Sequence, residues 1–242
     1  MTFFYNLGIL SLGKCQGGSF MNFLSIFDVI GPNMIGPSSS HTAGAVSIAL
    51  MARKMFPEPI QQVTFTLYGS FAKTYRGHGT DRALLGGILG FATDDERIRD
   101  AYEYAKNMGV KYEFVIDGDT QTNHPNTADI DITGVGGHTL SIRGESIGGG
   151  KMKIVRIDNI DVEFTGEYST LIVHQQDKPG VVAHITQALA EDNVNIAFMR
   201  LFREDKGAAA YTVVESDEHI PEKVLEQIRT NPNVDNLMLI QL

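Results

Sequence analysis

The chain has 242 residues, 43% of them hydrophobic and 20% charged, a balance that indicates a folded protein rather than a disordered one. Its formal net charge of −9 argues against broad electrostatic attraction to nucleic acid or to an anionic membrane. No apolar run approaches the ~20 residues of a transmembrane helix. The single cysteine, Cys15, allows no intrachain disulfide, so a reducing, cytoplasmic setting is the simplest interpretation.

The first twenty residues do not fit a secretory signal, because they have neither a basic start nor a small-residue cleavage site. A second methionine, Met21, follows Gln-Gly-Gly-Ser-Phe, and codons for Gln-Gly-Gly can spell a ribosome-binding sequence. We therefore expect residues 1–20 to be a translated leader. A disordered N-terminal extension is the alternative.

The region up to residue 165 mixes helices and strands. Hydrophobic periodicity predicts helices at 42–56, 80–90 and 95–109. Strands are predicted at 61–70, 111–117, 128–133 and 138–146, and two more follow a glycine-rich turn at 148–150. Thr80 is the expected cap of the second helix, and Gly109 ends the third. The pattern predicts an α+β domain over residues 21–165.

The pattern changes after a short linker at 165–169. Residues 168–242 read as strand, helix, strand, strand, helix, strand. This βαββαβ order is that of a ferredoxin-like unit. The sequence therefore predicts two α+β domains, 21–165 and 168–242.

A cluster of small hydroxyl residues surrounds one histidine where the first helix begins. Its members are Ser38, Ser39, Ser40, His41 and Thr42. One such residue would suffice to cap the helix, which is the structural alternative. A helix N-terminus also binds carboxylates and favours a neutral imidazole nearby. We therefore take His41 as a candidate proton-abstracting base and the four hydroxyls as candidate substrate ligands.

Two other polar stretches of the same domain carry histidines, "YRGHGTDRA" (75–83) and "TNHPNTADI" (122–130). Their candidate ligand-binding residues are His78, Thr80, Asp81, His124 and Asn126. Each stretch alone also fits a loop, a helix cap or a turn. Three such stretches in one domain predict a converging site. His138, His174, His184 and His219 are interpreted as structural or solvent-exposed.

The second domain offers its own candidate ligand site. Asp177 and the backbone around Gly180 precede a predicted helix, where they could hold the amine and carboxylate of an amino acid. The alternative is an ordinary turn between a strand and a helix.

Three motifs resemble a known family in their order and spacing. These are "SIFDVIGPNMIGPSSSHTAGA" (25–45), "YGSFAKTYRGHGTDRALLGGILG" (68–90) and "HPNT" (124–127). They resemble the β subunit of the iron–sulfur-dependent L-serine dehydratases, or L-serine ammonia-lyases, over Met21 to Leu242. The "DKPGVVAHIT" stretch resembles the ACT domain, a ferredoxin-like amino-acid sensor. The first domain is similar to the allosteric substrate-binding domain of some phosphoglycerate dehydrogenases.

The resemblance implies conversion of L-serine to pyruvate and ammonia, a step of amino-acid catabolism that can feed gluconeogenesis. It implies a [4Fe–4S] cluster that acts as a Lewis acid on the serine hydroxyl and is ligated by a separate α subunit. A chain with one cysteine cannot hold a four-cysteine cluster, so no metal ligand is expected here. The implied partners are the α subunit, L-serine and further copies bound through the ACT domain, but neither nucleic acid nor a membrane.

The resemblance leaves some roles open. It implies that His41 removes the α-proton, whereas the residues of the other two stretches could act in the active site or in an allosteric site. A different class of function, a serine-sensing regulatory protein without chemistry, also suits the two predicted domains. A pyridoxal-phosphate enzyme is disfavoured, because no lysine stands in a recognisable Schiff-base context.

Overall fold

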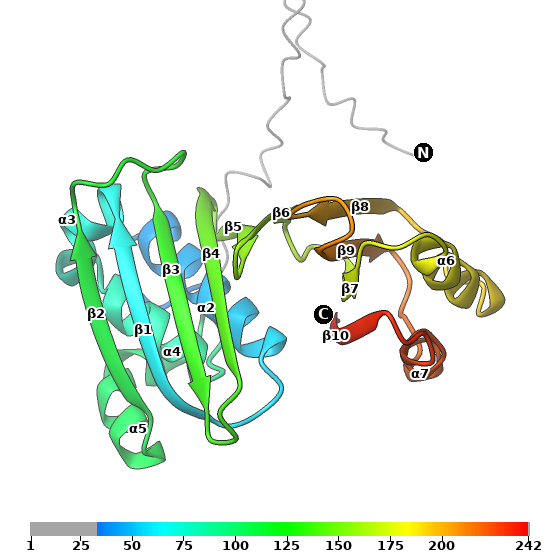
Figure 1. Ribbon diagram of the computed structural model, residues 1–242. Helices are drawn as coiled ribbons and strands as arrows, with labels where there is room; N and C mark the ends of the chain where they lie inside the picture. The colour runs from blue at the N-terminus through cyan, green and yellow to red at the C-terminus, as the bar shows by residue number, and fades with distance from the viewer. Residues whose placement is uncertain (1–32, 242) are drawn as a thin grey trace, which may run out of the picture.

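A computed structural model of the chain describes residues 33–241, which form two packed α+β domains (Figure 1). The predicted α+β class is confirmed. The expected leader, Cys15 and residues 25–32 of the first motif lie outside the described residues. Within 33–241, no helix has the length and apolar character needed to cross a bilayer.

The first domain is built on a six-stranded sheet with helices on one face (Figure 1). The strand order is β2-β1-β3-β4-β5-β6, and only the β1–β2 pair is parallel. The strands are β1 (Ile60–Tyr68), β2 (Lys111–Asp117), β3 (Thr127–Gly134), β4 (Thr139–Gly148), β5 (Lys151–Ile157) and β6 (Ile160–Phe164).

The helices of this domain bury one face of the sheet. They are α2 (Gly44–Met55), α3 (Gly69–His78), α4 (Thr80–Ile88) and α5 (Ala101–Met108), with a π-helical turn η1 (Ser39–Ala43) and a 3₁₀ turn η2 (Glu96–Asp100). Val63, Phe65 and Leu67 alternate along β1 and are fully buried, as the two-residue period of a strand requires. A side chain at Gly144 of β4 would meet Ile48 of α2 at 2.3 Å, so this glycine lets the helix lie close to the sheet.

Two predictions about the 68–90 stretch are wrong. Residues 69–78 form helix α3, whereas the sequence predicted a strand up to residue 70 and no helix between residues 56 and 80. Thr80 does not cap α4. Gly79, with a φ of 66°, takes the cap position and turns the chain directly from α3 into α4. The left-handed conformation suits glycine, so no separate loop is needed.

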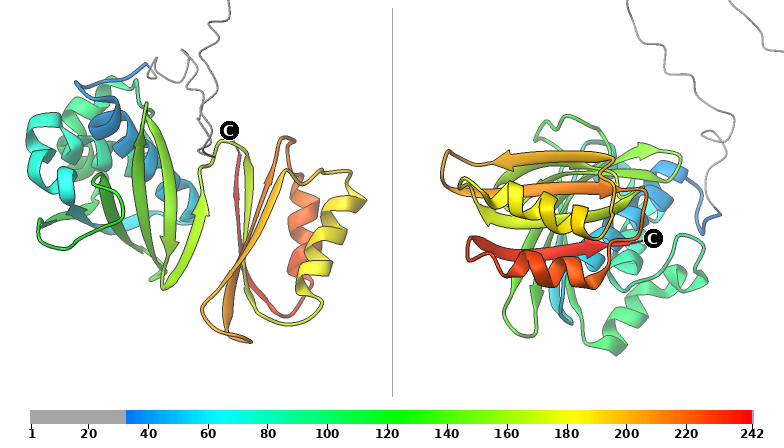
Figure 2. Two further views of the ribbon diagram at one scale, coloured as in Figure 1. Left: turned by 90° about the horizontal axis from the view of Figure 1, so that it is seen from above. Right: turned by 90° about the vertical axis from the view of Figure 1, so that its right-hand side faces the viewer.

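The second domain has the predicted βαββαβ order. Its elements are β7 (Ser169–Gln176), α6 (Val181–Glu191), β8 (Phe198–Arg203), β9 (Ala209–Ser216), α7 (Glu222–Arg229) and β10 (Val234–Ile240). The sheet order is β10-β7-β9-β8, and α6 and α7 lie on the side away from the first domain (Figure 2).

The other face of the four-stranded sheet packs against the first domain. Met238 and Ile240 of β10 belong to the same buried cluster as Met51 and Met55 of α2. The hydroxyl of Tyr211 on β9 donates a hydrogen bond of 2.9 Å to the Asp158 carboxylate at the turn before β6. The two domains therefore share an apolar core that joins the second domain to helix α2.

Candidate functional site

His41 lies on η1 with a hydroxyl group beside each of its ring nitrogens. Its Nε2 atom is 2.8 Å from the Oγ atom of Ser70 at the start of α3. Its Nδ1 atom is 3.1 Å from Ser40 Oγ and 3.4 Å from Ser38 Oγ. A neutral imidazole donates at one nitrogen and accepts at the other, and a hydroxyl can do either, so this arrangement holds the neutral ring in place.

The turn that carries His41 is fixed from both sides. Ser38 is extended, and its Oγ atom accepts a hydrogen bond of 3.1 Å from the His41 N–H, which caps the helix start. On the other side, Ser146 of β4 donates from its hydroxyl to the Ser40 carbonyl at 2.7 Å. A side chain at Gly44 would collide with Ser146, so the glycine permits this close approach. A π-helical turn of this kind frequently marks a functional site.

The ring of His41 is enclosed by two other rings. The His78 ring meets it edge to face with centroids 4.6 Å apart, and Phe71 does so at 5.5 Å. Burial, and then the charge of His78, hold the pKa of His41 below its ordinary value of 6.5. The sequence predicted a lowered pKa from the helix end, whereas burial and the second imidazole are the causes found here. His41 is therefore neutral at pH 7 and able to accept a proton.

The remaining hydroxyls of the first cluster have different environments. Thr42 is 2% exposed, and its hydroxyl donates to the His78 carbonyl at 2.9 Å. This bond joins the first cluster to the end of α3. Ser39 lies half-buried in the same turn. The predicted role of these residues as substrate ligands stays a prediction.

The third predicted stretch is joined to the first through two serines, Ser70 and Ser146, whose N–H groups donate to its backbone. The Ser70 N–H donates to the Pro125 carbonyl at 2.7 Å, and the Ser146 N–H donates to the Asn126 carbonyl at 2.9 Å. The Nδ1 atom of His124 accepts a hydrogen bond of 3.2 Å from the Asn126 N–H, which closes the turn. Ser70 and Ser146 therefore connect the first and third stretches, while the bond from Thr42 to the His78 carbonyl connects the first and second. Sequence reasoning singled out neither serine, although Ser70 lies in the quoted 68–90 motif.

Thr80 and Asp81 lie on α4 in the interior. Thr80 is fully buried, and its hydroxyl has no hydrogen-bond partner among the described residues. The Asp81 carboxylate accepts a hydrogen bond of 2.7 Å from the hydroxyl of Tyr102 on α5. Asp81 is thus engaged with α5, while His78 is the residue of this stretch that reaches His41.

In the second domain, Asp177 and Gly180 lie in the turn before α6. The Asp177 carboxylate accepts hydrogen bonds of 3.1 Å from the Arg203 guanidinium and from the Gly207 N–H. Gly180 has a φ of 92° and occupies the cap position of α6. The carboxylate would have to share or leave these partners to bind an amino-acid amine.

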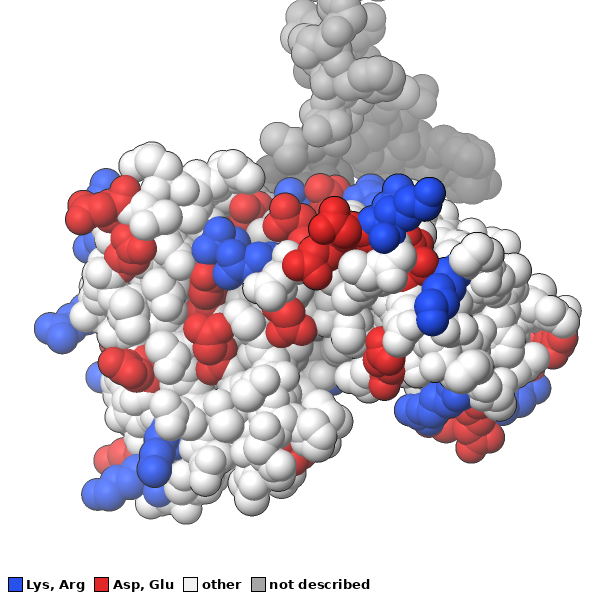
Figure 3. Space-filling view, viewed as in Figure 1, with Lys and Arg blue, Asp and Glu red and all other residues white. Residues whose placement is uncertain are grey.

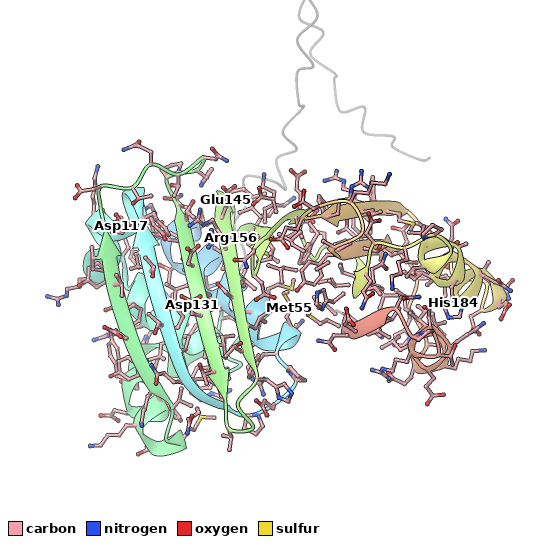
Figure 4. The ribbon with its side chains drawn as sticks, in the orientation of Figure 1. Met55, Asp117, Asp131, Glu145, Arg156 and His184 are labelled. Carbon is pink, nitrogen blue, oxygen red and sulfur yellow. The ribbon has the colours of Figure 1, made fainter. Side chains whose placement is uncertain are left out.

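The sheet face that the helices leave open carries many charged side chains (Figure 3). Asp129 of β3 is 7% exposed there and accepts hydrogen bonds from Tyr68, Arg143 and Arg156. Glu145 and Arg156 lie near one end of this face, and Asp131 lies farther along β3 (Figure 4). Burial by itself raises the pKa of Asp129. The hydrogen bonds from Arg143 and Tyr68 and the nearby arginine charges outweigh burial, so the pKa lies below its ordinary value.

The described residues do not fit a metal cluster. Within 33–241, no group of three or more histidine, cysteine or acidic side chains is arranged to hold a metal ion. The chain's one cysteine lies outside this range. Any iron–sulfur cluster near His41 would therefore need ligands from outside the described residues.

Comparisons with known proteins cover both domains. The profile of the family described as "Serine dehydratase beta chain" matches residues 25–135, and that of the ACT domain matches 169–233. The "Probable L-serine dehydratase, beta chain" of Bacillus subtilis is 41% identical over 214 residues, 88% of this chain and 96% of the relative. The "L-serine dehydratase, beta chain" of Peptoniphilus asaccharolyticus is 42% identical over 208 residues, 86% of this chain and 94% of the relative.

A second group of relatives is named for a different activity. The D-3-phosphoglycerate dehydrogenase of Bacillus subtilis is 25% identical over 199 residues. The match spans 82% of this chain but only 37% of that enzyme. The same two-domain arrangement is therefore similar to a part of a larger protein as well as to separate beta chains.

Proposed function

Since the chain belongs to the family of L-serine dehydratase beta chains, we propose that it is one subunit of an L-serine ammonia-lyase. The reaction is the conversion of L-serine to pyruvate and ammonia in the cytoplasm. The observation that supports this proposal best is His41, a partly buried histidine with a lowered pKa and a hydroxyl beside each ring nitrogen.

In this proposal His41 acts as the general base. Its unprotonated nitrogen accepts the α-proton of serine, and the electron pair of the broken C–H bond forms the Cα–Cβ double bond as hydroxide leaves Cβ. The resulting aminoacrylate takes up a proton and is hydrolysed to pyruvate and ammonia. Ser40 and Ser70 keep the ring oriented, and Phe71 limits the access of water to it.

The partner in this proposal is an α subunit that carries a [4Fe–4S] cluster. The beta-chain names of the relatives support a partner of this kind. The cluster supplies a Lewis acid for the serine hydroxyl when it is bound. The residues described here include no ligand set for it, so the beta chain contributes the histidine and the surrounding polar groups.

The test is a substitution of His41 in the anaerobically assembled complex with the α subunit. We expect His41→Ala to lower kcat by about 10²–10⁴-fold, the usual contribution of a general base, while serine still binds. Pyruvate formation measures turnover, and iron content shows that the complex is intact. Turnover near that of the unsubstituted complex would remove His41 from the mechanism.

A serine-sensing regulatory protein is the second candidate function. The match to about a third of a phosphoglycerate dehydrogenase favours a sensor, because the matching domains are only a part of that enzyme. A sensor would bind serine without forming pyruvate, even with a cysteine-bearing partner and an intact cluster. The activity assay of the complex therefore separates the two candidates.

The ACT domain has a regulatory role in the proposed enzyme. Its turn at Asp177 and Gly180 would bind an amino acid, and ACT domains of separate copies would associate. We expect Asp177→Asn to weaken binding of the amino acid to this turn without changing the iron content of the complex. Calorimetry with L-serine on the full complex tests amino-acid binding at the turn. Sedimentation of the intact chain tests the association of ACT domains.

A further inference from the structure

Three arginines line one hollow beside His78. The hollow has a volume of about 350 Å³, and Thr42 and His78 form part of its wall. Arg76 comes from the last turn of α3, Arg82 from the first turn of α4 and Arg99 from η2. Three separate elements therefore bring a guanidinium group to the same place.

The three guanidinium groups have no anionic partner in the part of the chain that the structure describes. None of them donates a hydrogen bond or forms an ion pair within residues 33–241, and no aspartate or glutamate lines the hollow. Arg97, two residues before Arg99, is by contrast paired with Asp95. Like charges around one hollow repel each other, and a bound anion would relieve that repulsion. A cationic hollow also stands out in a chain with a net charge of −9.

A polar atom without a partner in the described part of the chain also lies in the wall of the hollow. The Nδ1 atom of His78 is buried without a hydrogen-bond partner among the described residues. The cap position of α4 is Gly79, which has no side chain, and within the first turn the Arg82 N–H donates to the Asp81 carboxylate at 2.9 Å. Guanidinium groups present paired N–H donors that match the oxygen atoms of carboxylates and phosphates. The chemistry of the hollow therefore suits an oxyanion.

The hollow adjoins the candidate base. His78 lines the hollow, and its ring contacts the His41 ring with centroids 4.6 Å apart. Thr42, which follows His41 in the chain, lines the hollow and donates to the His78 carbonyl. We propose that Arg76, Arg82 and Arg99 form a binding site for a carboxylate or phosphate group next to His41.

The oxyanion has two possible sources. The first source is the carboxylate of L-serine bound at His41, an alternative that rests on the proposed function. The second is a separate small anion that occupies the hollow by itself. The difference is measurable, because only the first source makes an added anion compete with serine.

The first measurement uses orthophosphate as the probe on the full-length chain. Orthophosphate is titrated by calorimetry at low ionic strength, where screening is weak. We expect Arg76→Gln, Arg82→Gln and Arg99→Gln each to weaken its binding by about tenfold, since each removes one charge-assisted contact. Arg97→Gln is the matched control, because Arg97 is exposed, lies in the same segment as Arg99 and is already paired with Asp95. It should bind orthophosphate like the unsubstituted chain, and circular dichroism confirms that each variant is folded.

The second measurement identifies the source in the complex with the partner subunit. If the serine carboxylate occupies the hollow, orthophosphate raises KM competitively and the three variants raise KM about tenfold. If a separate anion occupies it, orthophosphate binds equally well at saturating serine. Absence of orthophosphate binding together with an unchanged KM in all three variants overturns the proposal. An equal loss of orthophosphate affinity in Arg97→Gln also overturns it. A complex that never forms pyruvate would count against the proposed function alone, because the titration of the isolated chain does not depend on turnover.

Discussion

The Nε2 atom of His41 lies 2.8 Å from the Oγ atom of Ser70, although 29 positions separate the two residues in the sequence. Ser70 also donates its N–H to the Pro125 carbonyl, so one residue contacts both the first and the third of the histidine-bearing stretches. The orientation of the candidate base therefore depends on the start of α3 as much as on its own turn.

We predict that Ser70→Ala lowers kcat about tenfold or more while KM for serine changes little, because the imidazole loses a partner that orients it. Ser70 is a positioning residue in this account, so the split between kcat and KM is the informative measurement. Ser47→Ala is the matched control. Ser47 is a helical serine whose hydroxyl bonds to the Gly150 carbonyl, and its loss should reduce stability by about 1 kcal/mol without lowering kcat. Equal losses of kcat in both variants would contradict the role of Ser70.

The pH dependence of the complex should report on the contact between His41 and His78. His41 must be neutral to accept a proton, and burial and His78 lower its pKa, so the acidic limb of kcat/KM should lie below pH 6.5. In His78→Gln the charge of the second imidazole is gone, while burial, the larger cause, remains. The limb should therefore move upward but stay below 6.5. His138→Gln, at an exposed hairpin turn beside Glu58, should leave the limb in place. A limb that does not move in His78→Gln would show that His78 does not affect the base.

Much of the fold follows from local patterns. The buried alternation of Val63, Phe65 and Leu67 and the left-handed Gly109 at the end of α5 produce elements where periodicity and capping rules place them. Helix α3 was not predicted, because "GSFAKTYRGH" contains two glycines and few apolar residues, and only Phe71 and Ala72 are buried. Its helical form depends on tertiary contacts that no local rule contains.

The candidate site is likewise predicted only in part from local sequence patterns. The clustering of serines around His41 is visible in the sequence, because composition and a helix start mark it. Ser146 cannot be found in that way, since its part in the site comes from the position of β4 beside η1. Of the three arginines of the hollow, Arg76 and Arg82 lie in one quoted stretch, but Arg99 joins them only through the packing of η2 against α4.

Gly69 gives a stability test of the junction between β1 and α3. Its φ is 51°, and a Cβ atom there would lie 2.6 Å from the Pro125 carbonyl oxygen. We predict that Gly69→Ala destabilises the protein by roughly 2–4 kcal/mol, because left-handed strain and a backbone collision add together. Gly109→Ala is the control for strain alone, since its φ is 72° with no atom near the new Cβ, and about 1 kcal/mol is expected. If urea unfolding shows equal losses of unfolding free energy in both variants, the collision with Pro125 does not add to the destabilisation.

Asp129 provides a test of the charged face of the sheet. Its carboxylate accepts hydrogen bonds of 2.6 and 2.8 Å from Arg143 and of 2.9 Å from Arg156. We predict that Asp129→Asn destabilises the protein by ~2–3 kcal/mol, less than for a fully buried pair because the arginine side chains are about a quarter exposed. Asp131→Asn, on the same strand and the same face but exposed, should change stability by less than ~0.5 kcal/mol.

The pH dependence of stability separates this ion pair from a simple packing effect. The pKa of Asp129 is lower in the folded protein than its ordinary value of 3.8, so its contribution is complete above that value. As the pH falls through the lower folded pKa, the carboxylate becomes protonated and the contribution is lost. Asp129→Asn cannot titrate, so the difference in unfolding free energy between it and the unsubstituted protein should shrink below pH 3.8. A difference that stays constant down to pH 2 in urea unfolding would show that the carboxylate charge does not stabilise this face.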